Sequence, residues 1–477
     1  MHYHLKSLSL ATLVLSLSLP VGVAESQTKG SVQTTLTAQV QMMIKQSERL
    51  FEGLQLYELG KAQFSKGQEQ EALETFQKAL VIFREVDDKK FQGLTLYKMG
   101  QVYENLSQYD MALKSYKQAL PLVKELEGVV LGTMATVYAD QGDYPKALNL
   151  YQQALAIAQR LNDKVGEMKR LYNLGTVYSE LGNYSKSMEL FQQALKITRK
   201  LDDRAGEANT LNSIASVYIN IGDYAKALDL AQQALAIQAK IDNKAALPPI
   251  FSNFGDIYLQ LADYATALEK YNQALGIIET IGNSAFKANI LQKIAGVYIR
   301  LGQYEKALDL NVQALTIYSK IDSKSGMVTI FNNIGRVYEQ IGKYSEALKL
   351  YQKALNILNV TGGNTAKART FNNIGSAYWN LRQYDKALIY YQQALVIRKK
   401  SGIKEGQAKT LNNIALVYYN QGKYTQALNY YQQGLVIARE LKDKDTEAIS
   451  LTNIGVTYNA LGNYSDAETN LFIAIEA

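Results

Sequence analysis

A repeat of forty residues constrains this chain more than any other feature. The strings "LYNLGTVYSELGNYSKSMELFQQAL" from Leu171, "FNNIGRVYEQIGKYSEALKLYQKAL" from Phe331 and "FNNIGSAYWNLRQYDKALIYYQQAL" from Phe371 share one pattern. Consecutive units are 40 residues apart, except for one step of 35. A period of this length predicts an array of stacked units rather than one globular core. A small residue marks the frame eleven times, at Gly60, Gly100, Ala135, Gly175, Ala215, Gly255, Ala295, Gly335, Gly375, Ala415 and Gly455.

Each unit has the pattern of two amphipathic helices. In the first helix, apolar residues recur at spacings of three and four, as in Phe371, Ile374 and Tyr378. Aspartates and asparagines in the polar connections are suited to cap the next helix. A single hairpin cannot bury both of its faces, so neighbouring units must stack. The sequence therefore predicts an all-α solenoid of about eleven helix-turn-helix units over residues 51–477.

The small and aromatic positions have a packing explanation. Glycine or alanine at the marked position, and alanine twelve residues later, allow the two helices of a unit to approach closely. Of the 34 tyrosines, 26 occur at fixed positions of this frame. We therefore interpret them as aromatic residues of the core whose polar hydroxyl groups lie near its edge, and not as a surface on which nucleic-acid bases stack.

The order small, aromatic, small, aromatic, small, at Gly375, Tyr378, Ala387, Tyr391 and Ala394, resembles the tetratricopeptide repeat. The family's first-helix tryptophan and its closing proline are missing here. The longer unit is similar to that of the kinesin light chain subgroup and of many bacterial arrays, including those that precede CHAT protease domains in cyanobacteria. The resemblance implies a right-handed superhelix whose first helices, called the A helices, line a concave surface that binds peptides.

Composition argues against catalysis. The chain has no cysteine, and its only histidines are His2 and His4. Thiolate nucleophiles and cysteine-ligated zinc are thereby excluded, and no catalytic or metal-binding motif is present. We expect no enzyme activity, no cofactor and no metal site. The formal net charge of +7 is dispersed along the chain, which does not indicate a nucleic-acid partner.

The first residues have the pattern of a secretory signal. Lys6 precedes an apolar run from Leu8 to Leu19, and small or turn-forming residues follow up to Ala24. We predict a signal peptide over residues 1–24, with an uncleaved membrane anchor as the alternative, and export to the periplasm or the cell exterior. No later stretch is apolar enough to span a membrane. Residues 25–50 form a polar segment that becomes a helix capping the first repeat.

Asparagines recur on the face that the resemblance places in the groove. Asparagine is a mediocre helix former, so its recurrence needs an explanation. One explanation is structural, with side-chain amides bonded to neighbouring repeats. The other is recognition, since each amide offers one acceptor and two donors to an extended peptide. The candidate peptide-binding residues are Asn173, Asn253, Asn333, Asn373, Asn413 and Asn453, two before the mark, and Asn332, Asn372 and Asn412, three before it.

Four further residues are candidates on the same face: Arg336, Arg369, Trp379 and Asn380. An exposed tryptophan among asparagine and arginine is typical of an interaction hot spot. The alternative for Trp379 is a half-buried position between repeats. No repeat reproduces the lysine and asparagine set with which some family members bind a chain-terminal carboxylate.

These observations predict an exported scaffold that binds a partner protein or an extended peptide in the concave groove of the A helices. The alternative is a sensor or regulatory array that belongs with a CHAT-type protease domain absent from this chain. The last unit ends on "NLFIAIEA" without a polar capping helix, so self-association through this repeat is a further expectation.

Overall fold

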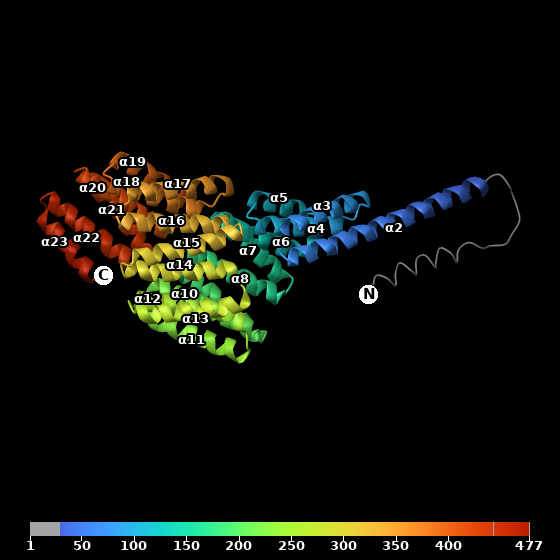
Figure 1. Ribbon diagram of the computed structural model, residues 1–477, viewed down its shortest axis with the longest axis horizontal. Coiled ribbons are helices and arrows are strands. Elements are labelled where there is room, and N and C mark those ends of the chain that lie inside the picture. Colours follow the sequence, from blue (N-terminus) through green and yellow to red (C-terminus); the bar gives the residue numbers. More distant parts are fainter. Residues whose placement is uncertain (1–28, 442, 477) are drawn as a thin grey trace.

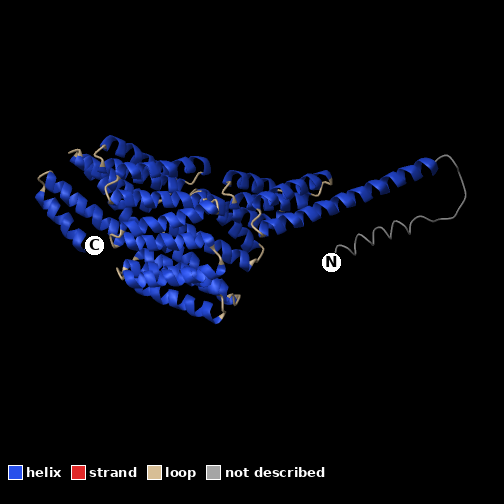
Figure 2. Cartoon of the chain, in the orientation of Figure 1, coloured by secondary structure: helices blue, strands red, loops and turns tan. Residues whose placement is uncertain are grey.

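The chain is an array of paired helices (Figures 1 and 2). Its structure, a computed structural model, describes residues 29–441 and 443–476, and these ranges contain no strand. The all-α solenoid predicted from the sequence is confirmed. The A helices are α2 (Lys29–Ser65), α4 (Lys89–Asn105), α6 (Glu127–Asp140), α8 (Lys164–Glu180), α10 (Arg204–Ile221), α12 (Leu247–Gln260), α14 (Ser284–Arg300), α16 (Lys324–Gln340), α18 (Asn364–Asn380), α20 (Lys404–Asn420) and α22 (Lys444–Ala460).

Each A helix is followed by a second helix, the B helix of its unit. The B helices are α3 (Glu69–Glu85), α5 (Tyr109–Ala119), α7 (Tyr144–Arg160), α9 (Tyr184–Lys200), α11 (Tyr224–Lys240), α13 (Tyr264–Ile281), α15 (Tyr304–Lys320), α17 (Tyr344–Thr361), α19 (Tyr384–Lys400), α21 (Tyr424–Leu441) and α23 (Tyr464–Glu476). Two short 3-10 helices, η1 (Lys124–Leu126) and η2 (Lys244–Ala246), precede α6 and α12.

A regular unit divides its forty residues between two equal helices and two short turns. In the fourth unit, α8 and α9 each have 17 residues. The forty-residue period therefore comes from long helices and not from a long connection. The turn after α8 places Gly182 at φ +76°, and the same turn position holds Ala262 and Arg382 at φ +58° and +59°. Left-handed backbone is thus required here, but glycine is not.

The predicted caps are present at most connections between units. Asp163, Asp203 and Asp443 each accept a hydrogen bond from the backbone N–H three residues later, at 2.9, 2.8 and 3.0 Å. Such caps satisfy donors that a helix start leaves open. Four connections depart from this rule. Helices α6 and α12 follow a 3-10 helix and have no side-chain cap, and Gly363 and Ile403 also have no capping side chain. The connections at Gly363 and Ile403 have other contacts, described below.

The marked small residues lie beneath aromatic rings of the B helices. A Cβ added to Gly335 would be 2.4 Å from the Tyr351 ring, and one added to Gly60 would be 2.8 Å from the Phe76 ring. The absent side chain therefore makes room for the ring. The core assignment of the B-helix tyrosines is confirmed, because each of them is buried: Tyr116, Tyr151, Tyr271, Tyr351, Tyr391 and Tyr431.

The hydrophobic core continues from unit to unit. One cluster joins Val328 and Tyr351 of the eighth unit to Ile374 of the ninth. The next cluster joins Tyr391 of the ninth unit to Leu411 of the tenth. Each helix pair thus buries its second face against the following pair, as expected for a solenoid.

The second unit is the irregular one. Its B helix α5 has only 11 residues, and η1 lies between it and α6. The step of 35 residues between marks therefore shortens the second helix and changes its connection. In Figure 1, helices α2 to α5 extend along the long axis, away from the later units.

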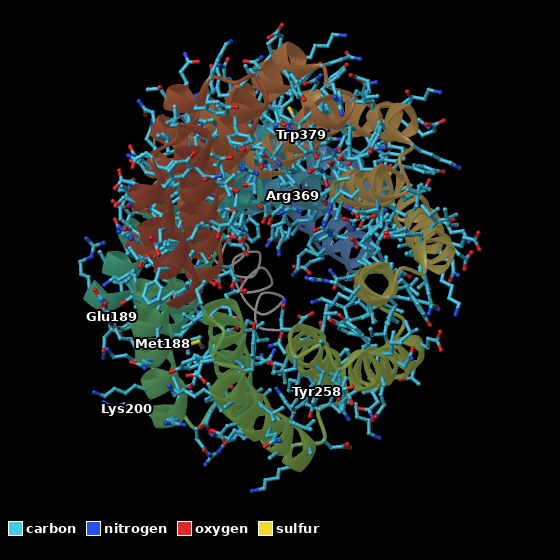
Figure 3. All side chains as sticks on the ribbon, turned by 90° about the vertical axis from the view of Figure 1, so that its left-hand side faces the viewer. Met188, Glu189, Lys200, Tyr258, Arg369 and Trp379 are labelled. Carbon is cyan, nitrogen blue, oxygen red and sulfur yellow. The ribbon has the colours of Figure 1, made fainter. Side chains whose placement is uncertain are left out.

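The superhelix closes on itself. Viewed end-on in Figure 3, the helix pairs follow one another around a ring, and helices of the last units lie beside those of the third and fourth units. The backbone N–H of Asn364 donates to the carbonyl oxygen of Gln141 at 2.8 Å. Thr365 lies against Gly142 in the same place. The connection between units eight and nine is therefore bonded to the turn of unit three.

A second closing contact lies one unit further along. Ile403 is buried in the core cluster that contains Tyr144, Leu171 and Leu174. Leu441 and Glu405 face the Gly182 turn. We call residues 141–144 and 181–184, together with 362–365, 402–405 and 441, the closing contacts. The connections at Gly363 and Ile403, which have no side-chain cap and no 3-10 helix, both take part.

The N-terminal end of the array begins with one long helix. Helix α2 runs unbroken from Lys29 to Ser65, so the predicted capping helix and the first A helix are one element. The predicted signal peptide over residues 1–24 lies outside the described residues. In the described part of the chain, no helix is both long and apolar enough to cross a membrane.

Candidate functional site

The A helices present polar side chains toward the inside of the ring. Figure 3 shows Arg369 of α18 toward the centre, while Glu189 and Lys200 of α9, a B helix, lie on the outer rim. Exposed A-helix side chains on the side of Arg369 therefore face the space inside the superhelix. We call this surface the inner face.

One cavity on the inner face brings together several of the predicted residues. It has a volume of about 310 Å³ and lies between α16, α18, α19 and α20. We call it the inner cavity, and its lining residues are Arg336, Glu339, Gln340, Asn372, Asn373, Ser376, Trp379, Tyr391, Asn413 and Leu416. Five of these were predicted as candidates, and consecutive repeats bring them together because each occupies the same face of its A helix.

The asparagines form hydrogen bonds between consecutive repeats. The side-chain N–H of Asn373 donates to Asn332 Oδ1 at 2.9 Å, and that of Asn413 donates to Asn372 Oδ1 at 3.2 Å. Asn253 donates to Asn212 Oδ1 at 2.8 Å in the same way. In each pair, the donor lies two residues before the small residue that marks its unit. The acceptor lies three residues before the small residue that marks the preceding unit. This is the structural alternative that the sequence left open.

Other polar pairs occupy the same position where asparagine is absent. Asn333 donates to Gln292 Oε1 at 3.2 Å. Tyr172 and Ser213 share a hydrogen bond of 2.7 Å between the fourth and fifth units. A polar link between neighbouring A helices is thus a general feature of this array, and asparagine is its commonest form.

Three of the predicted asparagines are buried between repeats: Asn253, Asn332 and Asn412. Asn332 donates to Thr370 Oγ1 at 3.0 Å, and Asn412 donates to Ser450 Oγ at 2.9 Å. Their amides are engaged by neighbouring repeats instead of being presented to the groove, which corrects their predicted place on the concave surface.

The remaining candidates are partly or fully exposed. Arg336 and Arg369 are exposed, while Asn173, Asn453 and Asn380 are half-buried. Asn380 donates to the backbone oxygen of Ser376 at 3.0 Å. Within the described residues, neither arginine forms an ion pair. Asn173 and Asn453 lie in units four and eleven, so the structure does not bring them to the inner cavity.

Trp379 is half-buried, as its structural alternative predicted, and it also lines the inner cavity. Its ring packs against the cluster that contains Tyr391 and Leu411. The indole Nε1 is buried and has no hydrogen-bond partner among the described residues. An unpaired buried N–H is unfavourable and therefore calls for an explanation.

A carboxylate network forms one wall of the inner cavity. Glu339 accepts hydrogen bonds from the Tyr351 hydroxyl and from Ser376 Oγ, the latter at 2.8 Å. Burial raises the pKa of Glu339, while these two hydrogen bonds and nearby Arg336 partly offset the rise. Ser376 and Tyr391 were not among the sequence candidates, because serine and a framework tyrosine carry no distinctive signal there.

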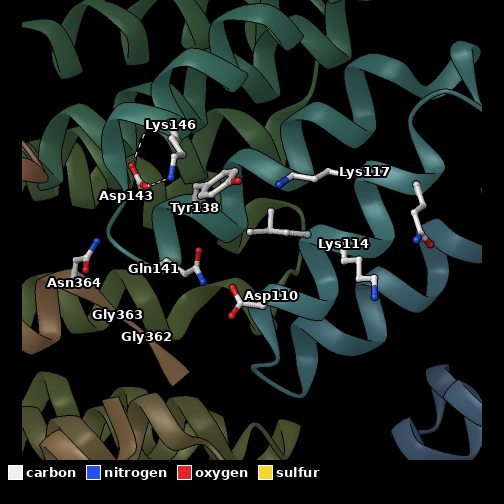
Figure 4. Close-up of a pocket in the computed structure, with 12 residues that line it drawn as sticks. Asp110, Lys114, Lys117, Tyr138, Gln141, Asp143, Lys146, Gly362, Gly363 and Asn364 are labelled. Atoms are coloured by element: carbon white, nitrogen blue, oxygen red, sulfur yellow. Dashed lines mark hydrogen bonds and ion pairs between the residues drawn. The ribbon is translucent and has the colours of Figure 1, made fainter. Parts of the chain in front are cut away.

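A larger cavity lies at the first closing contact. It has a volume of about 600 Å³ and is lined by α5, by α6 and α7 near Gln141, and by residues 362–364 (Figure 4). Lys146 forms an ion pair with Asp143 at 2.7 Å there. Sequence reasoning did not identify this region. The available signal was the unusual connection "TGGN", with two consecutive glycines where most units have a side chain that caps the helix.

Metal binding has no candidate in the part of the chain that the structure describes. No group of three or more His, Cys, Asp or Glu side chains there is placed to hold an ion.

Comparisons with known proteins bear on this arrangement. A sequence model described as tetratricopeptide repeat matches residues 54–125, 127–200, 170–240, 247–320, 326–400 and 406–471. The chain belongs to the tetratricopeptide-repeat family. In this tetratricopeptide-repeat array, the matched segments include every residue that lines the inner cavity. No curated protein matches the chain.

Two solved structures are similar to parts of the tetratricopeptide array. One is the crystal structure of BtubC (BKLC) from P. vanneervenii, with 22% identity over 47% of this chain and 91% of that chain, and a TM-score of 0.37. The other is the apo form of RapI, with 17% identity over 57% of this chain and 97% of that chain, and a TM-score of 0.44. At these identities the likeness concerns the repeat fold alone.

Proposed function

We propose that this tetratricopeptide-repeat protein is an exported scaffold that binds an extended segment of a partner protein on its inner face. The inner cavity carries the proposal, because Arg336, Trp379 and three asparagines from three successive A helices meet there. Arginine and tryptophan are the residues that most often dominate binding energy at protein interfaces. Catalysis forms no part of this function.

Site-specific photo-crosslinking tests the location of the partner. A photoreactive residue at Gln340 lines the inner cavity, and one at Lys200 lies on the outer rim (Figure 3). We expect adducts with a recurring partner from position 340 and not from position 200. The substitution Arg336→Glu should reduce the yield at 340 strongly. Equal adduct formation from both positions would contradict binding on the inner face.

Export is the second half of the proposal and rests on the sequence of residues 1–24. A secreted chain whose first residue is Glu25 is the expected product. N-terminal sequencing of protein recovered from outside the cytoplasm measures this directly, and a chain retained inside the cell with an intact N-terminus would refute it.

A further inference from the structure

The inner cavity holds hydrogen-bond donors that have no partner. The Trp379 indole N–H is buried and unpaired, and no described residue accepts from the Asn372 side-chain N–H. Arg336 is exposed and forms no ion pair in the described part of the chain. Arg336 and Asn372 therefore place unpaired donors from two adjacent A helices beside one small space, and Trp379 forms part of its wall.

The charged acceptor in the same cavity is already used. One oxygen of Glu339 accepts from Tyr351 and the other accepts from Ser376. The Asn372 oxygen accepts from Asn413. Within the described residues, neither Glu339 nor the Asn372 oxygen accepts from Arg336 or from the Asn372 N–H, so these donors are open to the carboxylate of a ligand.

Basic residues are also exposed on A helices α14, α18 and α20, outside the lining of the cavity. Arg300 of α14 and Arg369 of α18 are exposed and, within the described ranges, form no ion pair. Lys409 of α20 is also exposed, and it is paired with Glu405 at 2.5 Å. Glu339 is the one acidic residue that lines the cavity. Arg336 is exposed and forms no ion pair within the described residues, whereas Glu339 is half-buried and hydrogen-bonded, so an anionic group is favoured here over a cationic one.

We propose that the inner cavity binds the side-chain carboxylate of an aspartate or glutamate in an extended segment of the partner. The proposal deepens the proposed function and rests on it. Arg336 pairs with the carboxylate, because a guanidinium matches its two oxygens. The Asn372 side-chain N–H supplies a further donor, and Trp379 forms part of the wall beside it. The free oxygens of Asn373 and Asn413 remain for peptide N–H groups of the same segment.

The size of the cavity agrees with this occupant. Its volume of about 310 Å³ is at the low end of ligand pockets. It accommodates one side chain and adjoining backbone, and not a folded domain.

Trp379 is the only tryptophan of the chain, so its fluorescence reports on the cavity directly. The probe is a short glycine–serine peptide with one central glutamate and both ends blocked, titrated into the full-length protein. The matched peptide carries glutamine instead. A third peptide carries the glutamine and a free C-terminal carboxylate. We expect a saturable emission change with the glutamate peptide, weakened by added salt, and binding at least tenfold weaker for the other two.

Variants then assign the contact to Arg336. We expect Arg336→Gln to weaken binding of the glutamate peptide about tenfold, and Arg336→Lys to recover part of that loss. Arg300→Gln removes an exposed arginine outside the cavity and should change affinity less than twofold. Both positions are exposed, and circular dichroism confirms that each of the three variants is folded.

Equal affinity for the glutamate and glutamine peptides would overturn the carboxylate assignment while leaving a peptide-binding groove in place. Tighter binding of the peptide with the free C-terminus would overturn the side-chain assignment, because the cavity would then bind chain-terminal carboxylates. Absence of any binding, by fluorescence and by titration calorimetry, would overturn the inference. The photo-crosslinking result would still decide the proposed function separately.

Discussion

At the scale of single residues, the small residue that marks each A helix is matched in size to the B-helix residue sixteen positions later. Gly335 lies beneath Tyr351 and Gly60 beneath Phe76, while Ala295 faces Asn311. A large residue on the B helix therefore goes with glycine on the A helix. Ala135 and Ala415 have tyrosines at the same spacing, so this match in size is a preference and not a strict rule. Close packing explains why the sequence repeats these choices.

A glycine-to-alanine pair tests this packing. We expect Gly335→Ala to destabilise the fold by about 1–2 kcal/mol, since the Tyr351 ring must move to admit a methyl group. Gly296→Ala is the matched control, because no atom lies within 4 Å of its added Cβ. There, alanine should stabilise the helix by about 0.5–1 kcal/mol. Urea unfolding followed by Trp379 fluorescence measures both, and midpoint shifts of the same sign would contradict the argument.

At the scale of elements, helices are joined by polar links as well as by the core. The Glu339 network ties α16 to α17 through Tyr351 and to α18 through Ser376. The asparagine links join successive A helices. These links fix how one repeat is rotated on the next, because each requires a defined register.

Glu339 should make this junction sensitive to pH. Burial raises the pKa of Glu339 in the folded chain above its ordinary value of 4.5. Because the pKa is higher in the folded than in the unfolded chain, the contribution of Glu339 to stability is greatest at low pH. This contribution is lost as the pH rises through the pKa of the folded chain. We expect Glu339→Gln to remove part of this loss of stability. The unfolding midpoint of the variant should therefore exceed that of the natural chain by more at pH 7 than at pH 5.

Thermal unfolding midpoints across that pH range measure the effect. Glu346→Gln, on the exposed first turn of α17, is the control and should leave the slope of stability against pH unchanged. An identical slope for Glu339→Gln and the natural chain would show that the buried carboxyl group does not control the junction.

At the scale of the whole molecule, the closing contacts turn an open spiral into a ring. They also bring charged groups together. Burial raises the pKa of Glu180, and Arg369 on the other side of the closure partly offsets this rise. A partner must therefore reach the inner face along the axis of the superhelix or after the closing contacts separate.

An engineered disulfide tests the closure. A Cβ at position 182 would be 3.8 Å from Glu405 Cβ, which is the usual separation in a disulfide. The chain contains no other cysteine, and Ala262 and Arg382 show that the turn tolerates a side chain. We expect Gly182→Cys with Glu405→Cys to cross-link rapidly on mild oxidation, without changing the small-angle scattering profile.

Gly302→Cys with Glu405→Cys is the control, because Gly302 has the same turn geometry but no neighbour within 4 Å. Non-reducing electrophoresis should show a faster-migrating species for the first pair alone. Slow cross-linking of the first pair, or a scattering profile that contracts on oxidation, would mean that the ring is open in solution.

The sequence by itself determined the repeat. Period, helix pairs, caps and buried tyrosines follow from short-range spacing, and local rules govern each of them. It also grouped Arg336, Asn373 and Trp379, because equivalent positions in stacked units share a face. The burial of Asn332 and Asn412 was not evident, since one polar residue type serves both a ligand surface and a repeat junction.

Only the tertiary structure decided the closure. A solenoid's curvature is the sum of small rotations between successive repeats, and a sequence pattern fixes each rotation only loosely. Whether the connections at Gly363 and Ile403 meet the turns at Gln141 and Leu181 therefore depends on that accumulated sum. The missing side-chain caps at Gly363 and Ile403 are explained by the closing contacts, such as the hydrogen bond between Asn364 and Gln141.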